Sequence, residues 1–283
     1  MKPGPYLFLI LLFTLFSGCG EPPVRKGPSD VVFAYGNGEG IYLLSGDGSL
    51  NKKVIGGYYY QPALSPDGTK IACVYDKSFQ ITIFNLDANR DLVGQPKNVY
   101  NSQAYSQESK PTPASCPVWS LDGQKLYFLN QNHLILYDYQ LMRTTSLFDF
   151  PENQTGGQTQ ESGNMKLSKE GDSLFCMMSE GEDKLDFWTV NLSANQGTQV
   201  AGICRALLSD FKFPPEISGD VLENLFGSAE NPAWGPIPSP DRRYFFYFRR
   251  DPGFPGKKRI EGFDRTTKEK FDVATLGYSL FGD

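Results

Sequence analysis

Histidine is almost absent from this chain of 283 residues, in which His133 is the only one. A Ser–His–Asp arrangement would have to use His133, and the Gly-x-Ser-x-Gly sequence of many serine hydrolases does not occur. Metal-dependent lyase sites that need several histidines cannot be built either. The run Ser45–Ser49 is interpreted as a turn between strands, not as a calcium loop. We therefore predict that the chain is not an enzyme and has no catalytic residues, no metal and no cofactor.

Clusters of basic residues are also missing. Lys and Arg total 27 against 32 Asp and Glu, which gives a net charge of −5. A mildly acidic chain without a basic patch is a poor match for nucleic acid, so we expect no nucleic-acid partner. The acidic residues offer many carboxylate pairs for glycoside chemistry, but no spacing singles out one pair.

Cysteine pairs of the Cys-x-x-Cys type do not occur, which removes the support for a zinc or thioredoxin-like site. Four cysteines stand well beyond the N-terminal segment: Cys73, Cys116, Cys176 and Cys204. They allow three complete disulfide pairings, and the sequence does not choose among them. The other interpretation is that they are buried free thiols that act as small apolar side chains.

A long apolar run is absent: the longest, Tyr6 to Phe16, is too short for a membrane span of roughly 20 residues. Lys2 precedes this run and Ser17-Gly18-Cys19 follows it, as in a secretory signal peptide. The end of the segment resembles a lipobox, although Phe16 stands where Leu is usual. This resemblance implies that Cys19 becomes the N-terminus and carries acyl chains that hold the protein on a membrane. Because Gly20 follows Cys19, the same resemblance favours the outer membrane in a cell that has one.

Three segments follow from this interpretation. Residues 1–18 are the signal peptide, residues 19–30 are the lipidated N-terminus with a flexible tether, and residues 31–283 form the folded domain.

One sequence motif, called the phrase below, repeats along the folded domain. Pro62–Val74 reads PALSPDGTKIACV and returns as PVWSLDGQKLYFL at Pro117–Leu129, with weaker copies near Ser168 and Ser239. Pro, Asp and Gly at these positions are typical of a tight turn between two antiparallel strands. The expected turn residues are Ser65, Pro66, Asp67, Gly68, Ser120, Asp122, Gly123, Ser168, Gly171, Ser239, Pro240 and Asp241. In the fourth copy the lead-in Pro232-Ala233-Trp234 is taken to stand four residues too early.

Each turn is followed by an apolar run without alternation, which indicates a strand covered on both faces. Four strands, named A to D in chain order, fit each unit, so we predict an all-β fold: a single β-propeller of four-stranded antiparallel blades. Five blades are expected, with the first completed by the C-terminal strand Leu276–Phe281, which would close the ring. Six is the alternative if Arg205–Asn231 hides a degenerate blade, although Ser218–Gly227 favours a short helix there.

The Ser-Pro-Asp-Gly phrase followed by a buried strand is similar to the repeat of TolB-type, WD-repeat-like bacterial propellers. The resemblance extends from about residue 30 to the end of the chain. It implies a periplasmic platform for protein–protein contacts.

The long connecting segments are expected on one face, opposite the short A–B and C–D turns. They are 101–115, 151–164, 205–231 and 251–258. Because loops carry function more often than scaffold strands, we predict that this face binds the partner. Its candidate residues are Phe211, Phe213, Phe226, Arg250, Phe254, Lys257 and Lys258.

The expected function is that of a membrane-anchored, extracytoplasmic lipoprotein that acts as a protein-binding or scaffolding propeller of the cell envelope. The main alternative is a carbohydrate-binding or carbohydrate-active propeller, and a purely structural envelope protein is the third. The sequence does not identify the partner.

Overall fold

A computed structural model defines the fold, and every described element is a β-strand or a turn. The described residues are 27–36, 39–75, 80–100, 114–151, 165–168, 170–180, 184–204, 227–228, 231–232, 234–239, 243–264, 266–267 and 269–276. Within these ranges, no helix is long and apolar enough to cross a membrane.

The strands form five antiparallel sheets of three or four strands and one short two-stranded pair. The first sheet contains β1 (Val32–Gly36), β2 (Gly40–Ser45) and β3 (Asn51–Gly56). The second contains β4 (Tyr59–Leu64), β5 (Lys70–Tyr75), β6 (Gln80–Leu86) and β7 (Leu92–Tyr100). The third contains β8 (Ala114–Trp119), β9 (Lys125–Asn130), β10 (His133–Asp138) and β11 (Arg143–Asp149).

The fourth sheet contains β12 (Met165–Leu167), β13 (Ser173–Glu180), β14 (Lys184–Asn191) and β15 (Gln196–Cys204). The last sheet contains β18 (Trp234–Pro238), β19 (Tyr244–Arg250), β20 (Lys258–Asp264) and β21 (Glu269–Leu276). The short pair consists of β16 (Gly227–Ser228) and β17 (Asn231–Pro232).

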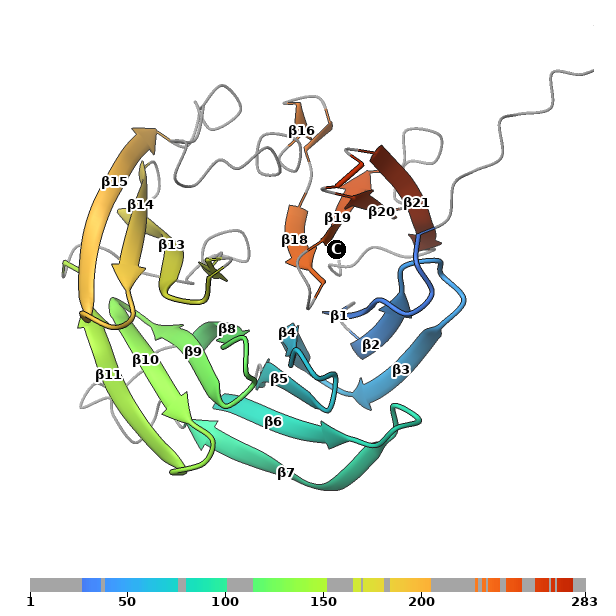
Figure 1. Cartoon of the computed structure of the whole chain (residues 1–283), viewed down its shortest axis with the longest axis horizontal. Coiled ribbons are helices and arrows are strands. Elements are labelled where there is room, and N and C mark those ends of the chain that lie inside the picture. Colours follow the sequence, from blue (N-terminus) through green and yellow to red (C-terminus); the bar gives the residue numbers. More distant parts are fainter. Residues whose placement is uncertain are drawn as a thin grey trace, which may run out of the picture.

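The sheets follow one another around a common centre, as the blades of a propeller do (Figure 1). The first strand of each four-stranded sheet lies toward the middle, and β7, β11 and β15 lie on the outside (Figure 1). The prediction of an all-β fold is thus confirmed, with several four-stranded antiparallel sheets arranged as in a propeller. The number of blades and the closing strand stay predictions, because 205–226 and 277–283 lie outside the described residues, as does most of the helix predicted at Ser218–Gly227.

The apolar runs are buried because each sheet is covered on both faces. In β5, Ile71 and Cys73 pack toward the first sheet, whereas Ala72 and Val74 pack toward the third. All four are fully buried. Similar apolar clusters join the third sheet to the fourth and the first sheet to the last. Because successive side chains of a strand point to opposite faces, one apolar run contributes side chains to two cores.

The first and last sheets meet through aromatic side chains. Phe33 of β1 stacks on Phe246 of β19, with ring centroids 4.2 Å apart and an interplanar angle of 16°. Phe271 of β21 packs edge-on against Phe246 at 6.2 Å. Segments near the two ends of the chain are therefore held together by packing of one sheet face on another.

A bulge interrupts the innermost strand of the second and third sheets. Gln61 and Cys116, each directly before a proline, have positive φ values of 49° and 55°. The strand register shifts at these points in β4 and β8. The same shift occurs in β18 between Trp234 and Ile237.

This shift corrects the expected lead-in of the fourth copy. Pro236 stands three residues before Ser239, just as Pro62 precedes Ser65 and Pro117 precedes Ser120. Pro236 is therefore the repeat proline, and Pro232-Ala233-Trp234 is not a displaced lead-in. The inserted residues that the sequence suggested are in fact the bulge, which is a regular part of the repeat.

Candidate functional site

Most of the predicted binding face cannot be placed. Phe211, Phe213, Phe226, Phe254 and Lys257 lie outside the described residues. Arg250 and Lys258 are backbone partners at one end of the β19–β20 pair. Cys19, Pro240 and Asp241 also lie outside the described ranges. The site is therefore built from the opposite edge of the sheets, which carries the A–B and C–D turns.

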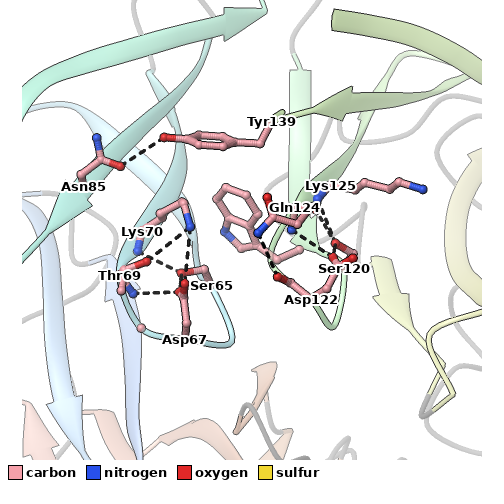
Figure 2. Close-up of polar contacts among 12 residues, drawn as sticks. Ser65, Asp67, Thr69, Lys70, Asn85, Ser120, Asp122, Gln124, Lys125 and Tyr139 are labelled. Atoms are coloured by element: carbon pink, nitrogen blue, oxygen red, sulfur yellow. Dashed lines mark hydrogen bonds and ion pairs between the residues drawn. The ribbon is translucent and has the colours of Figure 1, made fainter. Parts of the chain in front are cut away.

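Each Ser-x-Asp-Gly turn is closed by the same pattern of hydrogen bonds. Ser65 Oγ donates to Asp67 Oδ1 at 2.6 Å and accepts from Lys70 N at 2.9 Å. Asp67 Oδ1 also accepts from Thr69 N at 3.0 Å. Gly68 has φ of 68°, which glycine adopts without strain. These bonds close the turn between β4 and β5 (Figure 2).

The network recurs in the other copies. Ser120 Oγ donates to Asp122 Oδ1 at 2.5 Å and accepts from Lys125 N at 2.9 Å (Figure 2). Ser168 Oγ donates instead to Asp172 Oδ1 at 2.8 Å, two residues further along than the motif position, which Glu170 occupies. Ser239 Oγ accepts from Tyr244 N at 3.0 Å. The motif residues that the structure describes are thus structural.

A further copy of this hydrogen-bond network lies in the turn predicted at Ser45–Ser49. Ser45 Oγ donates to Asp47 Oδ1 at 2.6 Å and accepts from Leu50 N at 2.9 Å, between β2 and β3. This is the C–D position of the first sheet, where the other sheets use different turns. The prediction of a turn between strands at Ser45–Ser49 is confirmed, but its identity with the repeat turn was not predicted.

Lysines and aromatic rings fill the contact between the second and third sheets. Lys70 Nζ lies 5.2 Å from the ring centroid of Tyr139 and 5.9 Å from that of Trp119. Lys97 Nζ lies 5.4 Å from the rings of both Tyr137 and Tyr139. These distances fit cation–π attraction, which joins the two sheets.

Hydrogen bonds join the second and third sheets at the same contact and also link two turns of the third sheet. Trp119 Nε1 donates to Ala63 O at 3.0 Å. Tyr139 Oη donates to Asn85 Oδ1 at 3.4 Å (Figure 2). Tyr139 N donates to Gln124 O at 2.8 Å, so the C–D turn of the third sheet is tied directly to its A–B turn.

Three large apolar side chains are exposed on these two tied turns, and we call them the third-sheet turn patch. Leu121 is 41% exposed, Leu141 is 73% exposed and Met142 is 71% exposed. A Cβ atom at Gly171 would lie 2.8 Å from Leu121, so Leu121 extends over the neighbouring turn of the fourth sheet. Leu121 thus reaches the fourth sheet, whereas Leu141 and Met142 are exposed on the C–D turn of the third sheet.

His133 is placed on the other edge of the third sheet. Its Nδ1 lies 2.7 Å from Asp149 Oδ1, and the two side chains are 43% and 66% exposed. This hydrogen bond lowers the pKa of Asp149. Among the described residues, no group of three or more His, Cys, Asp or Glu could hold a metal ion.

Comparisons with known proteins bear on the fold. No family model matches the chain, and no curated protein matches it in sequence. TolB from Acinetobacter baumannii is similar in structure, with a TM-score of 0.46 and 14% identity, over 95% of this chain and 57% of that chain. This chain thus spans less than two thirds of that TolB.

Two enzymes are similar to a comparable degree. An oligogalacturonate lyase from Vibrio parahaemolyticus has a TM-score of 0.49 and 12% identity, over 91% of this chain and 71% of that chain. A puromycin-hydrolysing peptidase from Mycobacterium tuberculosis has a TM-score of 0.44 and 14% identity, over 86% of this chain and 33% of that chain. At these identities the likenesses concern the fold and assign no activity.

The prediction that the chain is not an enzyme is wrong as it was drawn. Structures of similar fold include a lyase and a hydrolase, so the propeller architecture does not exclude catalysis. The physical reason is that chemistry depends on particular side chains carried by a fold, and one fold supports many activities. The shortage of histidine removes some mechanisms only.

Proposed function

We propose that the chain is a lipid-anchored, extracytoplasmic propeller that binds another protein of the bacterial cell envelope through the third-sheet turn patch. The leader that ends at Cys19 and the tether behind it support the location. The exposure of Leu141 and Met142 on a hydrogen-bonded turn supports protein binding, and it is the observation that carries the proposal.

The turn that presents these two residues is well ordered by its own bonds. Asp138 Oδ1 accepts from Gln140 N at 3.0 Å and from Leu141 N at 2.9 Å. Met142 has φ of 52° at the position where the corresponding turns of the second and fourth sheets carry Arg90 and Asn195. Both of those residues are polar. An exposed methionine there adds nothing to the turn itself, whereas it offers an adaptable apolar contact to a partner.

Charges around the patch indicate the kind of surface that it fits. Asp122, Glu170 and Asp172 are exposed on the adjoining A–B turns, while Lys125 and Arg143 are the exposed basic residues close by in sequence. Interfaces commonly have an apolar centre and a polar rim of complementary charge. The proposed partner is therefore an envelope protein with an apolar contact patch bordered by basic side chains.

The double variant Leu141→Ser, Met142→Asn is expected to retain less than a tenth of the partner that the wild-type chain retains. Its measurement is a pull-down from detergent-solubilised envelopes with the full-length lipidated protein. The matched control is Leu92→Ser, Val93→Ser, which changes side chains that are 43% and 42% exposed on β7 of the second sheet. A protein lost with the patch variant and kept with the control supports the site. Equal recovery with both variants, or no specific protein at all, overturns it.

Location has a separate test. The full-length Cys19→Ala variant is expected to leave the membrane fraction, because the acyl chains that would anchor it have no attachment point. Fractionation of cells that express each form measures the distribution. A variant that stays with the membrane after a high-salt wash would contradict lipid anchoring.

A further inference from the structure

Two cysteines from neighbouring sheets share one apolar cluster. Cys176 of β13 is 2% exposed and belongs to the buried cluster between the third and fourth sheets. Cys116 of β8 is partly buried and packs against the same cluster. Both are free thiols in the structure. No described neighbouring sheets bring together another pair of cysteines in this way.

Cys116 lies at the bulge in β8, with its side chain toward the fourth sheet. Cys116 has φ of 55° and lies where the β8–β9 register shifts between Ser115 and Val118. Its backbone N donates a hydrogen bond to Gln61 Oε1 of the second sheet at 2.8 Å. Its sulfur accepts a hydrogen bond from the backbone N–H of Met165 in β12.

Met165 connects this sulfur to the second cysteine. In the β12–β13 pair, Met165 stands directly opposite Cys176. Residues that face each other in an antiparallel pair have Cβ atoms about 4.5–5.5 Å apart and on the same side of the sheet. Met165 and Cys176 are both buried in the cluster that Cys116 contacts. The Cys116 sulfur therefore lies beside the strand position that carries Cys176.

We propose that Cys116 and Cys176 form a disulfide that links the third and fourth sheets in the extracytoplasmic compartment, an inference that rests on the location proposed above. The oxidant is a thiol–disulfide oxidoreductase or oxidised glutathione. One thiolate attacks its S–S bond to give a mixed disulfide, and the second thiolate displaces the oxidant. The chain loses two electrons and two protons, and the oxidant's disulfide is reduced to two thiols.

Burial decides when this bond forms. Burial raises the pKa of the Cys116 thiol to about 11, and it also raises that of Cys176. Protonated thiols react slowly, since the thiolate is the nucleophile. The bond therefore forms while the sheets are still coming together. Once they have packed, the same burial shields it from reductants.

The other cysteines are placed less favourably. Cys73 is fully buried between the first and second sheets, and its Sγ donates to Thr82 O at 3.8 Å. Cys204 ends β15, which is separated from β13 by β14. Cys73 thus serves as a control thiol that should remain free.

The experiment maps thiols in the full-length protein extracted from envelopes. Free thiols are alkylated in denaturant without reductant, and the digest is analysed by mass spectrometry. A linked pair of peptides containing Cys116 and Cys176, with Cys73 alkylated, is expected. The same mapping is done on wild-type, Cys73→Ser and Cys116→Ser proteins that were reduced, unfolded and refolded with oxidised glutathione.

Each result has a defined meaning. The link should form in the wild-type and Cys73→Ser proteins and be lost in Cys116→Ser, and reduction should lower the melting temperature by about 5–10 °C. No Cys116–Cys176 link after refolding overturns the disulfide, as does a link to Cys204 instead, and neither touches the patch proposal. A link after refolding with free thiols in envelope protein supports the pairing but overturns the extracytoplasmic location.

Discussion

Phe246→Ala is expected to lower the free energy of unfolding by about 3–5 kcal/mol, because a large and fully buried aromatic side chain is removed. The ring stacks on Phe33 at 4.2 Å, and Phe271 packs against its edge. The vacated space lies between two sheets that come from opposite ends of the chain, so backbone connectivity cannot hold the gap closed. Urea unfolding of the purified protein measures the loss.

Phe128→Ala provides the matched control. Phe128 is also fully buried, but it belongs to the cluster between the second and third sheets. Both variants should lose similar stability, whereas only Phe246→Ala should increase hydrogen exchange in β1 and β2. If Phe246→Ala costs less than about 1 kcal/mol and leaves exchange in β1 unchanged, the packing of the last sheet on the first is refuted.

The sheets could be predicted from sequence because their signals are local. A Ser-x-Asp-Gly turn followed by a run such as Ile71–Val74 contains both the turn and the two-sided burial within a dozen residues. The contact between Phe33 and Phe246 joins residues that are more than 200 positions apart. No period in the sequence reports such a pairing, and the prediction of closure looked instead to a strand at the C-terminus.

The bulges have a sequence signal, the repeat proline, that was assigned to the wrong residue in the fourth copy. Pro62, Pro117 and Pro236 each stand three residues before the turn serine, which the spacing alone would have revealed. With Pro232 taken as the proline of the fourth copy, the constant spacing from proline to serine is lost. A proline cannot donate to the strand ladder, so the repeat proline is expected at a bulge of the innermost strand.

The candidate site could not be predicted for a different reason. Loop length favoured the opposite face, and five of the seven residues chosen there lie outside the described ranges. Leu141 and Met142 resemble core residues in composition, and only the fold shows that they are 73% and 71% exposed. Both residues lie in the C–D turn between β10 and β11, where no other strand covers them in the part of the chain that the structure describes.

Ser120→Ala is expected to lower the free energy of unfolding at neutral pH by about 2 kcal/mol, since it removes a bond to a charged group and leaves a backbone donor unmatched. Ser120 Oγ both donates to Asp122 Oδ1 and accepts from Lys125 N, and the residue is 8% exposed. The control is Ser193→Ala in an exposed turn, where Ser193 Oγ donates to Asn191 Oδ1 at 2.8 Å. That change should cost less than about 0.5 kcal/mol.

Acid should reduce the effect of Ser120→Ala, because the same hydroxyl controls the charge of Asp122. The hydrogen bond from Ser120 is the main cause that lowers the pKa of Asp122, with a further contribution from Gln124 N. A lowered folded pKa gives stability that is present above the unfolded value of about 3.9 and is lost as pH falls through the folded pKa. The difference in stability between wild type and Ser120→Ala should therefore shrink below about pH 4, and NMR titration should show the pKa of Asp122 returning toward its ordinary value in the variant. A difference that is the same at neutral and acid pH, with an unchanged Asp122 titration, would mean that the serine contributes through the Lys125 backbone bond alone.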